Sequence, residues 1–343
     1  MSRVYCIDFG TSAIKIYQKG IGIVYNEKNV LALFEKRKMI AIGDEAFGMI
    51  GKTPSEIEIV YPVRFGVLAE IKNTLSMLNT IFDKISEEHD KIPGQEVLIA
   101  VPCYATEVQR KAMVDIIADS EARPKRIRIV DMPIAAAIGA GVDLKESLSA
   151  MVVDIGADIT DISVVSRGGV IENNSLKIGG NLLDESIISA IRMEYKFIIG
   201  KKTAEQVRIK LGTCIEPSDE ESVEMKVLGR DLVSGLPGSI TVDSYLIYSA
   251  MKEAFETIAE NVNHILKSLS AEVSYDISDS GIFITGGVSQ TPGLDKLING
   301  ITHLDIKKGG DGSCAVALGL GKISEDPELD YLAEKYSAFT IIE

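Results

Sequence analysis

Two short stretches of the sequence place an aspartate and a glycine directly after an apolar run. Asp8-Phe-Gly-Thr-Ser-Ala13 follows VYCI, and Asp154-Ile-Gly-Ala-Asp-Ile159 follows MVV. A glycine allows a tight turn, hydroxyl and N–H groups donate to phosphate oxygens, and a carboxylate can hold a water on Mg²⁺. Both stretches are therefore candidate phosphate-binding loops, although the same residue types are frequent in plain hairpin turns.

The two candidate loops differ after the glycine. The first continues with Thr11 and Ser12, which are small donors suited to an anion. The second continues with Ala157, Asp158 and Ile159, which place a carboxylate and a β-branched apolar residue where small neutral residues are expected. The second loop therefore needs an explanation of its own.

A third glycine-containing stretch, Thr285-Gly-Gly-Val-Ser289, follows the apolar run GIFI. Glycines carry no side chain that would block the approach of a flat base or a ribose. A plain turn between a strand and a helix is the alternative reading of these residues. Residues 311–321 read as a capped helix of small residues, which is a structural feature by default.

The elements around these loops repeat. Residues 4–17 and 151–165 each read as an apolar strand, an Asp-x-Gly turn and a returning strand, which indicates a duplicated half. Residues 96–117 read as a strand and then a helix that begins at a threonine, with Glu107 near its start, and residues 127–142 as a strand and a Pro-initiated, Ala-rich helix. Residues 281–298 read as a strand, a Gly-Gly turn and a helix. Strands that alternate with helices predict an α/β fold with largely buried sheets.

Composition limits the function classes. The net charge of −14 and the sequence pI near 4.9 argue against non-specific binding to nucleic acid or anionic lipid. Four cysteines without CxxC spacing and three distant histidines argue against structural zinc, and free thiols suit a reducing cytoplasm. The start of the chain has no signal-peptide pattern, and no apolar run approaches the roughly 18 residues that a membrane-spanning helix needs. We therefore expect a cytoplasmic protein.

The order of these features is specific. An Asp loop, a strand–Asp-x-Pro–helix unit, a second Asp loop, a Gly-Gly loop and a small-residue helix follow one another as in the actin, sugar kinase and Hsp70 ATPase superfamily. Within it the sequence resembles the bacterial actin family MreB over most of residues 4–323. The motifs that carry the resemblance are GIGIVYNEK (20–28), IAIGDEA (40–46), GKTP (51–54), VPCYATEVQRKA (101–112), PIAAAIGAG (133–141), IGGNLLDESI (178–187), GKKTAEQVR (200–208) and GRDLVSGLP (229–237).

The resemblance implies an actin-like, duplicated ribonuclease H-like α/β fold. Its two lobes enclose a nucleotide cleft, and each has a larger and a smaller subdomain. The expected boundaries are 1–32, 66–145 and 315–343 for subdomain IA, 33–65 for IB, 146–180 and 245–314 for IIA, and 181–244 for IIB.

The resemblance also implies the ligand, ATP or ADP with Mg²⁺, and the residues that bind it. The phosphate loops match Gly10, Thr11, Ser12 and Ala13 and then Gly156, Ala157, Asp158 and Ile159. The adenosine contacts match Glu205, Gln206, Val207, Arg208, Gly286, Gly287, Val288 and Ser289. Asp8 and Asp154 are expected to hold Mg²⁺ through water.

Two positions depart from the family pattern in a way that concerns hydrolysis. The usual Glu-Glu-Pro is Asp131-Met132-Pro133 here, and the usual DIGGGTTE is DIGADITD. Met132 and Ile159 thus replace a glutamate and a threonine that could position the attacking water, and one such contact is worth ~10²–10⁴-fold in rate. We expect weak or absent ATP hydrolysis and name no confident catalytic residue.

Asp158 is open to several readings. Beside a γ-phosphate it would repel that group by roughly 4 kcal/mol for unit charges 4 Å apart at an effective dielectric of 20. It could instead recruit a cation, point into solvent, or reflect drift in a loop that no longer supports hydrolysis. The competing enzyme hypothesis is an active ATPase in which Asp158, Asp161 or Asp131 positions the water.

The resemblance finally implies a filament subunit that polymerises with copies of itself, or with MreB-like paralogues, into paired protofilaments for cell shape or shape-linked motility. Nucleic acid is not an expected partner. Direct membrane binding is not expected either, because the chain starts in a strand and the loop EEHDKIPGQ (87–95) is polar; filaments near the inner face of the membrane remain compatible with this. A non-polymerising ATPase of the chaperone or sugar-kinase type is disfavoured because no large substrate domain is inserted.

Overall fold

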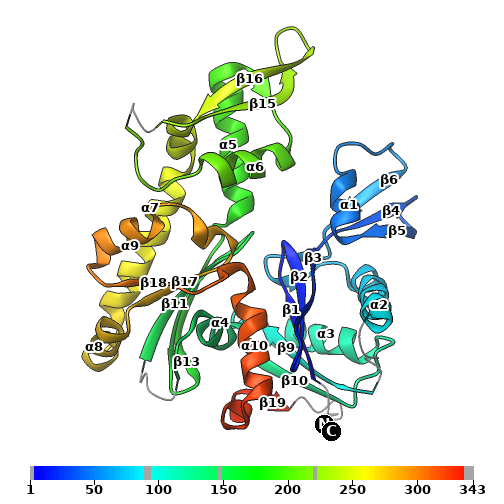
Figure 1. Ribbon diagram of the computed structural model, residues 1–343, viewed down its shortest axis with the longest axis vertical. Coiled ribbons are helices and arrows are strands. Elements are labelled where there is room, and N and C mark those ends of the chain that lie inside the picture. Colours follow the sequence, from blue (N-terminus) through cyan, green and yellow to red (C-terminus); the bar gives the residue numbers. More distant parts are fainter. Residues whose placement is uncertain (1–3, 89–93, 145–148, 219–221, 336–343) are drawn as a thin grey trace. The chain divides into compact units, whose positions relative to one another are not determined.

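The computed structural model describes residues 4–88, 94–144, 149–218 and 222–335 (Figure 1). The chain divides into two compact units. The first comprises residues 1–148, 163–173 and 309–343, and the second comprises residues 149–162 and 174–308. The expected division into four subdomains is finer than this and stays a prediction. The C-terminal tail beyond residue 335 and most of the loop 87–95 lie outside the described residues.

A six-stranded sheet forms the centre of the first unit, with the order β19-β10-β9-β1-β2-β3. Strand β1 (Val4–Phe9) runs antiparallel to β2 (Ala13–Gln18) and parallel to β9 (Glu96–Val101), which is parallel to β10 (Arg126–Asp131). Strands β3 (Gly22–Lys28) and β19 (Glu334–Lys335) form the edges. The predicted strand, turn and returning strand at residues 4–17 is thus confirmed.

The two faces of this sheet pack against different helices, because side chains alternate along a strand. The face that carries Ile7, Val97 and Ile99 joins one core cluster with buried side chains of α2 (Ile71–Glu88) and α3 (Glu107–Ala118). Figure 1 shows these two helices on one side of the strands, and α4 (Met132–Ala140) and α10 (Ala315–Glu325) on the other. Helix α3 begins at Thr106 as predicted, but the capping-box partner is Gln109.

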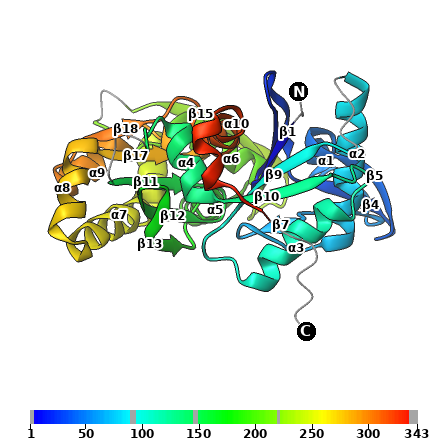
Figure 2. The same cartoon turned by 90° about the horizontal axis from the view of Figure 1, so that it is seen from below.

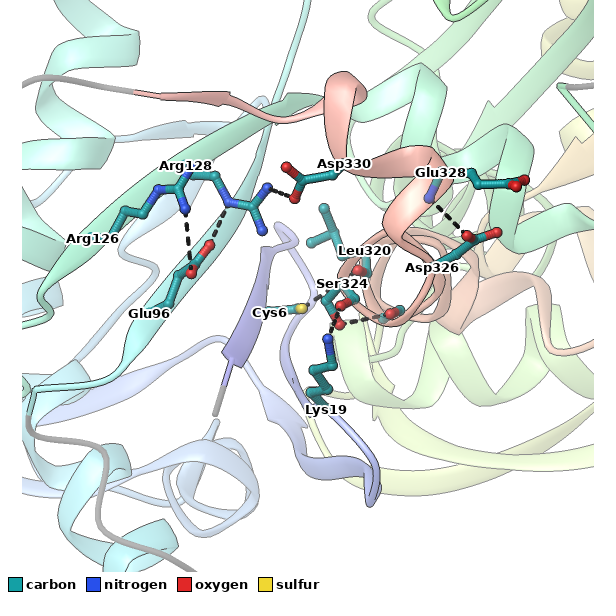
Figure 3. A network of polar contacts seen from close by, with 11 residues as sticks. Cys6, Lys19, Glu96, Arg126, Arg128, Leu320, Ser324, Asp326, Glu328 and Asp330 are labelled. Atoms are coloured by element: carbon teal, nitrogen blue, oxygen red, sulfur yellow. Dashed lines mark hydrogen bonds and ion pairs between the residues drawn. The ribbon is translucent and has the colours of Figure 1, made fainter. Parts of the chain in front are cut away.

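The opposite face of the sheet carries a polar network (Figure 3). Arg128, whose side chain is 4% exposed, forms an ion pair with Glu96. Its Nη1 also lies 2.5 Å from Oδ1 of Asp330, in the 3₁₀ segment η3 (Pro327–Leu332). Nearby, Cys6 Sγ donates to Leu320 O at 3.5 Å, and burial raises the pKa of this thiol to about 12, so it stays protonated. The network fastens the C-terminal segments to the sheet.

The remaining elements of the first unit are β4 (Leu31–Phe34), β5 (Lys38–Ile42), α1 (Gly43–Met49), β6 (Ile57–Val60), the short strands β7 (Val63–Arg64) and β8 (Val67–Leu68), and η2 (Gly312–Cys314). Strands β5, β4 and β6 form a small sheet in this order, and β7 pairs with β8 in a separate two-stranded sheet. A small apolar cluster in this region consists of Val30, Ala32, Ala41 and Ala46. Ala41 and Ala46 lie in the segment 33–65, and Val30 and Ala32 lie directly before it.

The second unit is built on a sheet with the order β13-β12-β11-β17-β18. Strand β11 (Ser149–Ile155) is parallel to β17 (Ile282–Thr285), and β17 is parallel to β18 (Ile306–Lys308). The returning strand β12 (Thr160–Ser166) completes the second predicted strand–turn–strand unit, and β13 (Gly169–Leu176) adds a further strand beside it. Residues 163–173, from the later part of β12 to the middle of β13, group with the first unit. Helix α7 (Ser244–Ser268) lies alongside β13, where Asn174 Nδ2 donates to Asn261 Oδ1 at 3.4 Å (Figure 2).

The other elements of the second unit are α5 (Gly180–Tyr195), β14 (Phe197–Ile198), α6 (Lys201–Leu211), β15 (Glu224–Asp231), β16 (Pro237–Asp243), α8 (Ala271–Ser280), η1 (Gly287–Gln290) and α9 (Leu294–Thr302). Strands β14, β15 and β16 form a three-stranded sheet. The Gly-Gly turn leads into the 3₁₀ segment η1, and α9 begins only after Pro292 and Gly293. The helix predicted directly after the glycines is therefore displaced by one short segment.

Helices α4 and α10 of the first unit pack closely against each other through glycines. A Cβ on Gly139 would overlap Ala315 O, and a Cβ on Gly319 would overlap Ala135 O. The two helix backbones are thus in direct contact through glycine, which leaves no room for a methyl group.

Gly139→Ala is expected to destabilise the protein by about 1–3 kcal/mol, the usual cost of overpacking, because the backbone of α10 must move. Gly300→Ala is the matched control: it is also a helical glycine, in α9, but nothing lies within 4 Å of the added Cβ, so stability should stay equal or rise. Urea unfolding of both variants measures this. Equal midpoints for the two variants would contradict the packing argument.

Candidate functional site

The first candidate loop joins β1 to β2 and is held by an ion pair. Asp8 and Lys15 are cross-strand partners in this hairpin, and Lys15 Nζ lies 3.4 Å from Asp8 Oδ2 with both residues buried. Gly10 is not in the left-handed region; a Cβ there would lie 2.6 Å from Ala13 O. Gly10 therefore permits the close backbone approach to Ala13 in this tight turn without a left-handed conformation.

Residues from two other segments of the first unit support this loop. Asn29 donates from its N–H to Ser12 O at 2.9 Å and from Nδ2 to Gly10 O at 2.8 Å. Gly66 N donates to Thr11 Oγ1 at 3.3 Å. Sequence reasoning missed Lys15 and Asn29. The signal for Lys15 was its place as a lone charge in the apolar strand AIKIY, opposite Asp8 in the hairpin.

The second candidate loop joins β11 to β12 and is held by the N-terminus of α5. Gly180 N donates to Gly156 O at 3.0 Å, and Asn181 N donates to Ala157 O at 2.8 Å. A Cβ on Gly179 would lie 2.6 Å from Ala157 C and O. The first N–H groups of a helix have no partner inside it, and here loop carbonyls accept from them.

Asp158 is also held at this helix end. Its Oδ1 accepts from Asn181 Nδ2 at 2.7 Å. A carboxylate is favoured beside the first turn of a helix because the helix dipole is positive there. Asp158 therefore helps to fix the loop to α5. Ile159, half-buried, contributes its carbonyl, which accepts from Gly156 N at 2.9 Å.

The other acidic groups considered for water activation are engaged as well. Asp131 Oδ1 lies 2.5 Å from Arg110 Nη2, and Met132, the first residue of α4, has no acceptor oxygen in its side chain. Asp161 accepts a hydrogen bond from Ser175 Oγ, and burial raises the pKa of Asp161 to about 6.

The predicted adenosine residues lie in two places in the second unit. On α6, Val207 is fully buried in the core, Gln206 is exposed, and Arg208 Nε donates to Asp184 Oδ1 at 2.6 Å. Glu205 is half-buried.

The second place is the turn after β17. Gly286 has φ +86°, and a Cβ there would overlap Ile155 O, so only glycine fits. Ser289 is buried, and its Oγ donates to Gly286 O at 2.7 Å, whereas Gly287 is exposed with nothing within 4 Å of a Cβ. Val288 reaches the region of α5, because its Cγ2 would lie 3.4 Å from a Cβ on Gly180. In this unit the fold thus brings together the second loop, the start of α5, Arg208 and the glycine turn.

The residues that the structure describes also bear on membrane-spanning helices and on directly bound metal ions. Among these residues no helix combines the length and apolar character that a membrane crossing requires. Over the same ranges no group of three or more His, Cys, Asp or Glu side chains is arranged to hold a metal ion directly.

Comparison with solved structures identifies the fold. MreB5 of Spiroplasma citri bound to ADP superposes with a TM-score of 0.88 at 31% identity, over 94% of this chain and 96% of that one. The MamK double helical filament, at 19% identity and a TM-score of 0.76, shares the fold alone. The chain therefore has the actin-like fold predicted from its sequence.

Comparison with sequences identifies the family. The model of the MreB/Mbl protein family matches residues 2–331. The cell shape-determining protein Mbl of Bacillus subtilis (strain 168) is 36% identical over 316 residues, which are 92% of this chain and 93% of Mbl. MreB of Escherichia coli (strain K12) is 36% identical over 324 residues, 93% of this chain and 92% of MreB. The chain belongs to the MreB/Mbl family of cell shape-determining, actin-like proteins, as its motifs predicted.

The raised pKa of Asp161 gives a test of its environment. Between the ordinary pKa of 3.8 and about 6, the folded protein holds a proton that the unfolded chain releases, so this group lowers stability as pH rises through that window. Asp161→Asn should remove this loss and stabilise the protein above pH 6, on the order of 2 kcal/mol.

Thermal unfolding between pH 5 and pH 8 measures this, with Asp279→Asn, an exposed position on α8, as the control. The gain for Asp161→Asn should grow from pH 5 to a little above pH 6 and then level off, while the control stays flat throughout. A pH-independent difference would show that Asp161 ionises freely in the fold.

Proposed function

We propose that this chain is a cytoskeletal filament subunit that binds adenine nucleotide with Mg²⁺ and hydrolyses ATP slowly or not at all. The observation that carries the last part is the pair of apolar side chains at Met132 and Ile159. Neither can accept a proton from water or orient it by a strong hydrogen bond. The acidic groups offered as substitutes are held by other partners: Asp131 by Arg110, Asp158 by Asn181, and Asp161 by Ser175.

Nucleotide binding is supported by relatives and by the loops. Solved structures of MreB5 of Spiroplasma citri carry ADP or AMPPNP and match 94% of this chain at 31% identity. In this proposal the loop 10–13 and the loop 156–159 bind phosphates through backbone N–H and small side chains, and the glycine turn at 286–289 and α6 bind adenosine. In this binding mode these residues hold and orient the nucleotide without activating water.

The acidic loop residues fit an indirect role toward Mg²⁺. Magnesium keeps several waters and is commonly held by substrate phosphates with one or two carboxylates. Asp8 is already paired with Lys15, so it suits a water-mediated contact better than a direct one. Asp154, whose Oδ1 lies 2.6 Å from where a Cβ on Gly286 would be, has the same role in the second unit. The ion would neutralise phosphate charge.

Self-assembly is supported by the family and by one exposed surface. Relatives named for cell shape span nearly the whole chain, and MamK forms a double helical filament. The β15–β16 hairpin exposes Val233 at 85% and Leu236 at 64% of their surface. Its turn is rigid, because Asp231 Oδ1 accepts from the N–H groups of Val233 and Ser234 at 2.8 and 2.7 Å. We propose that copies of this chain, alone or with paralogues, form paired protofilaments in the cytoplasm, beside the membrane without binding it directly.

The hydrolysis proposal predicts a gain of function. Met132→Glu combined with Ile159→Thr should raise phosphate release at saturating ATP and polymerising concentration by at least ~10-fold, because both variants restore a polar group of the kind that orients water. The control is Met132→Leu with Ile159→Val, which keeps both positions apolar and should leave release unchanged.

A wild-type rate of phosphate release as high as that of the Glu/Thr variant would contradict the proposal. In that case Asp158→Asn tests the competing hypothesis of an active ATPase, because an enzyme that depends on this carboxylate would lose most of its rate.

The assembly proposal predicts that Val233→Ser with Leu236→Ser raises the critical concentration for polymerisation about 10-fold or more, since a few buried apolar contacts dominate an interface. Sedimentation with and without ATP measures this. Val108→Ser, at a 78% exposed position in the first turn of α3, is the matched control. Unchanged sedimentation of the hairpin variant would remove this surface from the filament contact.

A further inference from the structure

Asp184 and Arg208 form a buried ion pair between helices α5 and α6 of the second unit. The side chain of Arg208 is 11% exposed and that of Asp184 is 10% exposed, with Nε and Oδ1 2.6 Å apart. A buried pair adds little to stability on average, because both charges lose their hydration. Its geometry is therefore more informative than its energy.

The guanidinium of Arg208 lies against the backbone of Gly180. A Cβ on Gly180 would be 3.2 Å from Arg208 Nη2 and 3.4 Å from its Cζ, and also 3.4 Å from Val288 Cγ2. The planar end of Arg208 and the side chain of Val288 thus flank the same glycine. Gly287, beside Val288, is exposed with open space around it.

Asp184 accepts a hydrogen bond from Arg208 Nε, the nitrogen that joins the guanidinium to the rest of the side chain. This bond restrains the rotation of the planar group, whose Nη2 lies beside Gly180. A second pair between the same two helices, Lys201 Nζ and Glu185 Oε1 at 3.5 Å, is exposed to solvent.

We propose that Asp184 is a positioning residue for the base of the bound nucleotide. It holds the guanidinium plane of Arg208 beside Gly180 and Val288, where that plane stacks on the base. A guanidinium stacks on an aromatic face through its delocalised charge, and an ammonium in its place does so less well. The inference rests on the proposed nucleotide binding and specifies which residues set affinity on the base side.

The phosphate side should be independent of this pair. The second loop is held by backbone hydrogen bonds from Gly180 and Asn181, which the change of a side chain at position 184 leaves in place. Loss of the pair should therefore weaken ligands that carry a base and spare ligands that consist of phosphate alone.

The test compares ATP with inorganic tripolyphosphate, both with Mg²⁺, as ligands of the full chain. In Asp184→Asn the affinity for ATP should fall about 5–30-fold, while the affinity for tripolyphosphate stays within about 2-fold. Glu185→Gln, which removes the charge from the exposed pair on the same helices, should change neither.

Arg208→Lys is the second variant. It keeps the charge and loses the plane, so it should weaken ATP as Asp184→Asn does. ATP affinity at the wild-type value in either variant would overturn the proposal. An equal loss for ATP and tripolyphosphate, with a lower unfolding midpoint in the absence of ligand, would overturn it in favour of a purely structural pair. A wild type that binds neither ligand would instead refute the proposed function.

Discussion

The second loop depends on one close backbone contact. At the start of α5, Gly179 packs so close to Ala157 that an added Cβ would lie 2.6 Å from the carbonyl C and O of Ala157. The next two N–H groups, those of Gly180 and Asn181, donate to the carbonyls of Gly156 and Ala157. These bonds use backbone atoms alone, so they do not depend on which side chain stands at position 159. A threonine could be replaced by Ile159 without disturbing the turn. Loop conformation and water activation are thus separable in this chain.

The two duplicated hairpins reach similar loops by different means. The first is fixed mainly by side chains, through the Asp8–Lys15 pair and the hydrogen bond from Asn29 Nδ2 to Gly10 O, with one further bond from the backbone N–H of Asn29, all within one unit. The second is fixed by a helix terminus, with Asp158 and Asn181 as an added side-chain contact. The charges differ accordingly. Asp8 is compensated by a buried lysine, whereas Asp158 is compensated by the helix dipole and an amide.

The sequence was most informative where local pattern decides structure. The two strand–turn–strand units, the Pro-initiated helix α4 and the helix that begins at Thr106 follow from alternation and capping chemistry over a few residues. The superfamily followed from the order of such units, and the family followed from motifs such as PIAAAIGAG (133–141). Lys15 and Asn29 were missed because their roles depend on strand register and on contacts across the fold. Gly10 was assigned to a tight turn, and the folded hairpin adds the physical reason, which is the closeness of Ala13 O. Asp184 gave no local signal at all, because its partner is 24 residues away on another helix.

A filament subunit that hydrolyses its nucleotide can change its nucleotide state in two ways, by hydrolysis of ATP and by exchange of the bound nucleotide. With Met132 and Ile159 at the water-positioning sites, the proposed function leaves nucleotide exchange as the main way. A ligand can bias a conformational equilibrium only by its difference in affinity for the two states. The groups that set nucleotide residence then control the filament. On the phosphate side these groups are mostly backbone atoms, which sequence change affects little. The buried Asp184–Arg208 pair lies on the base side, so a single side chain there can adjust residence without altering the phosphate loops.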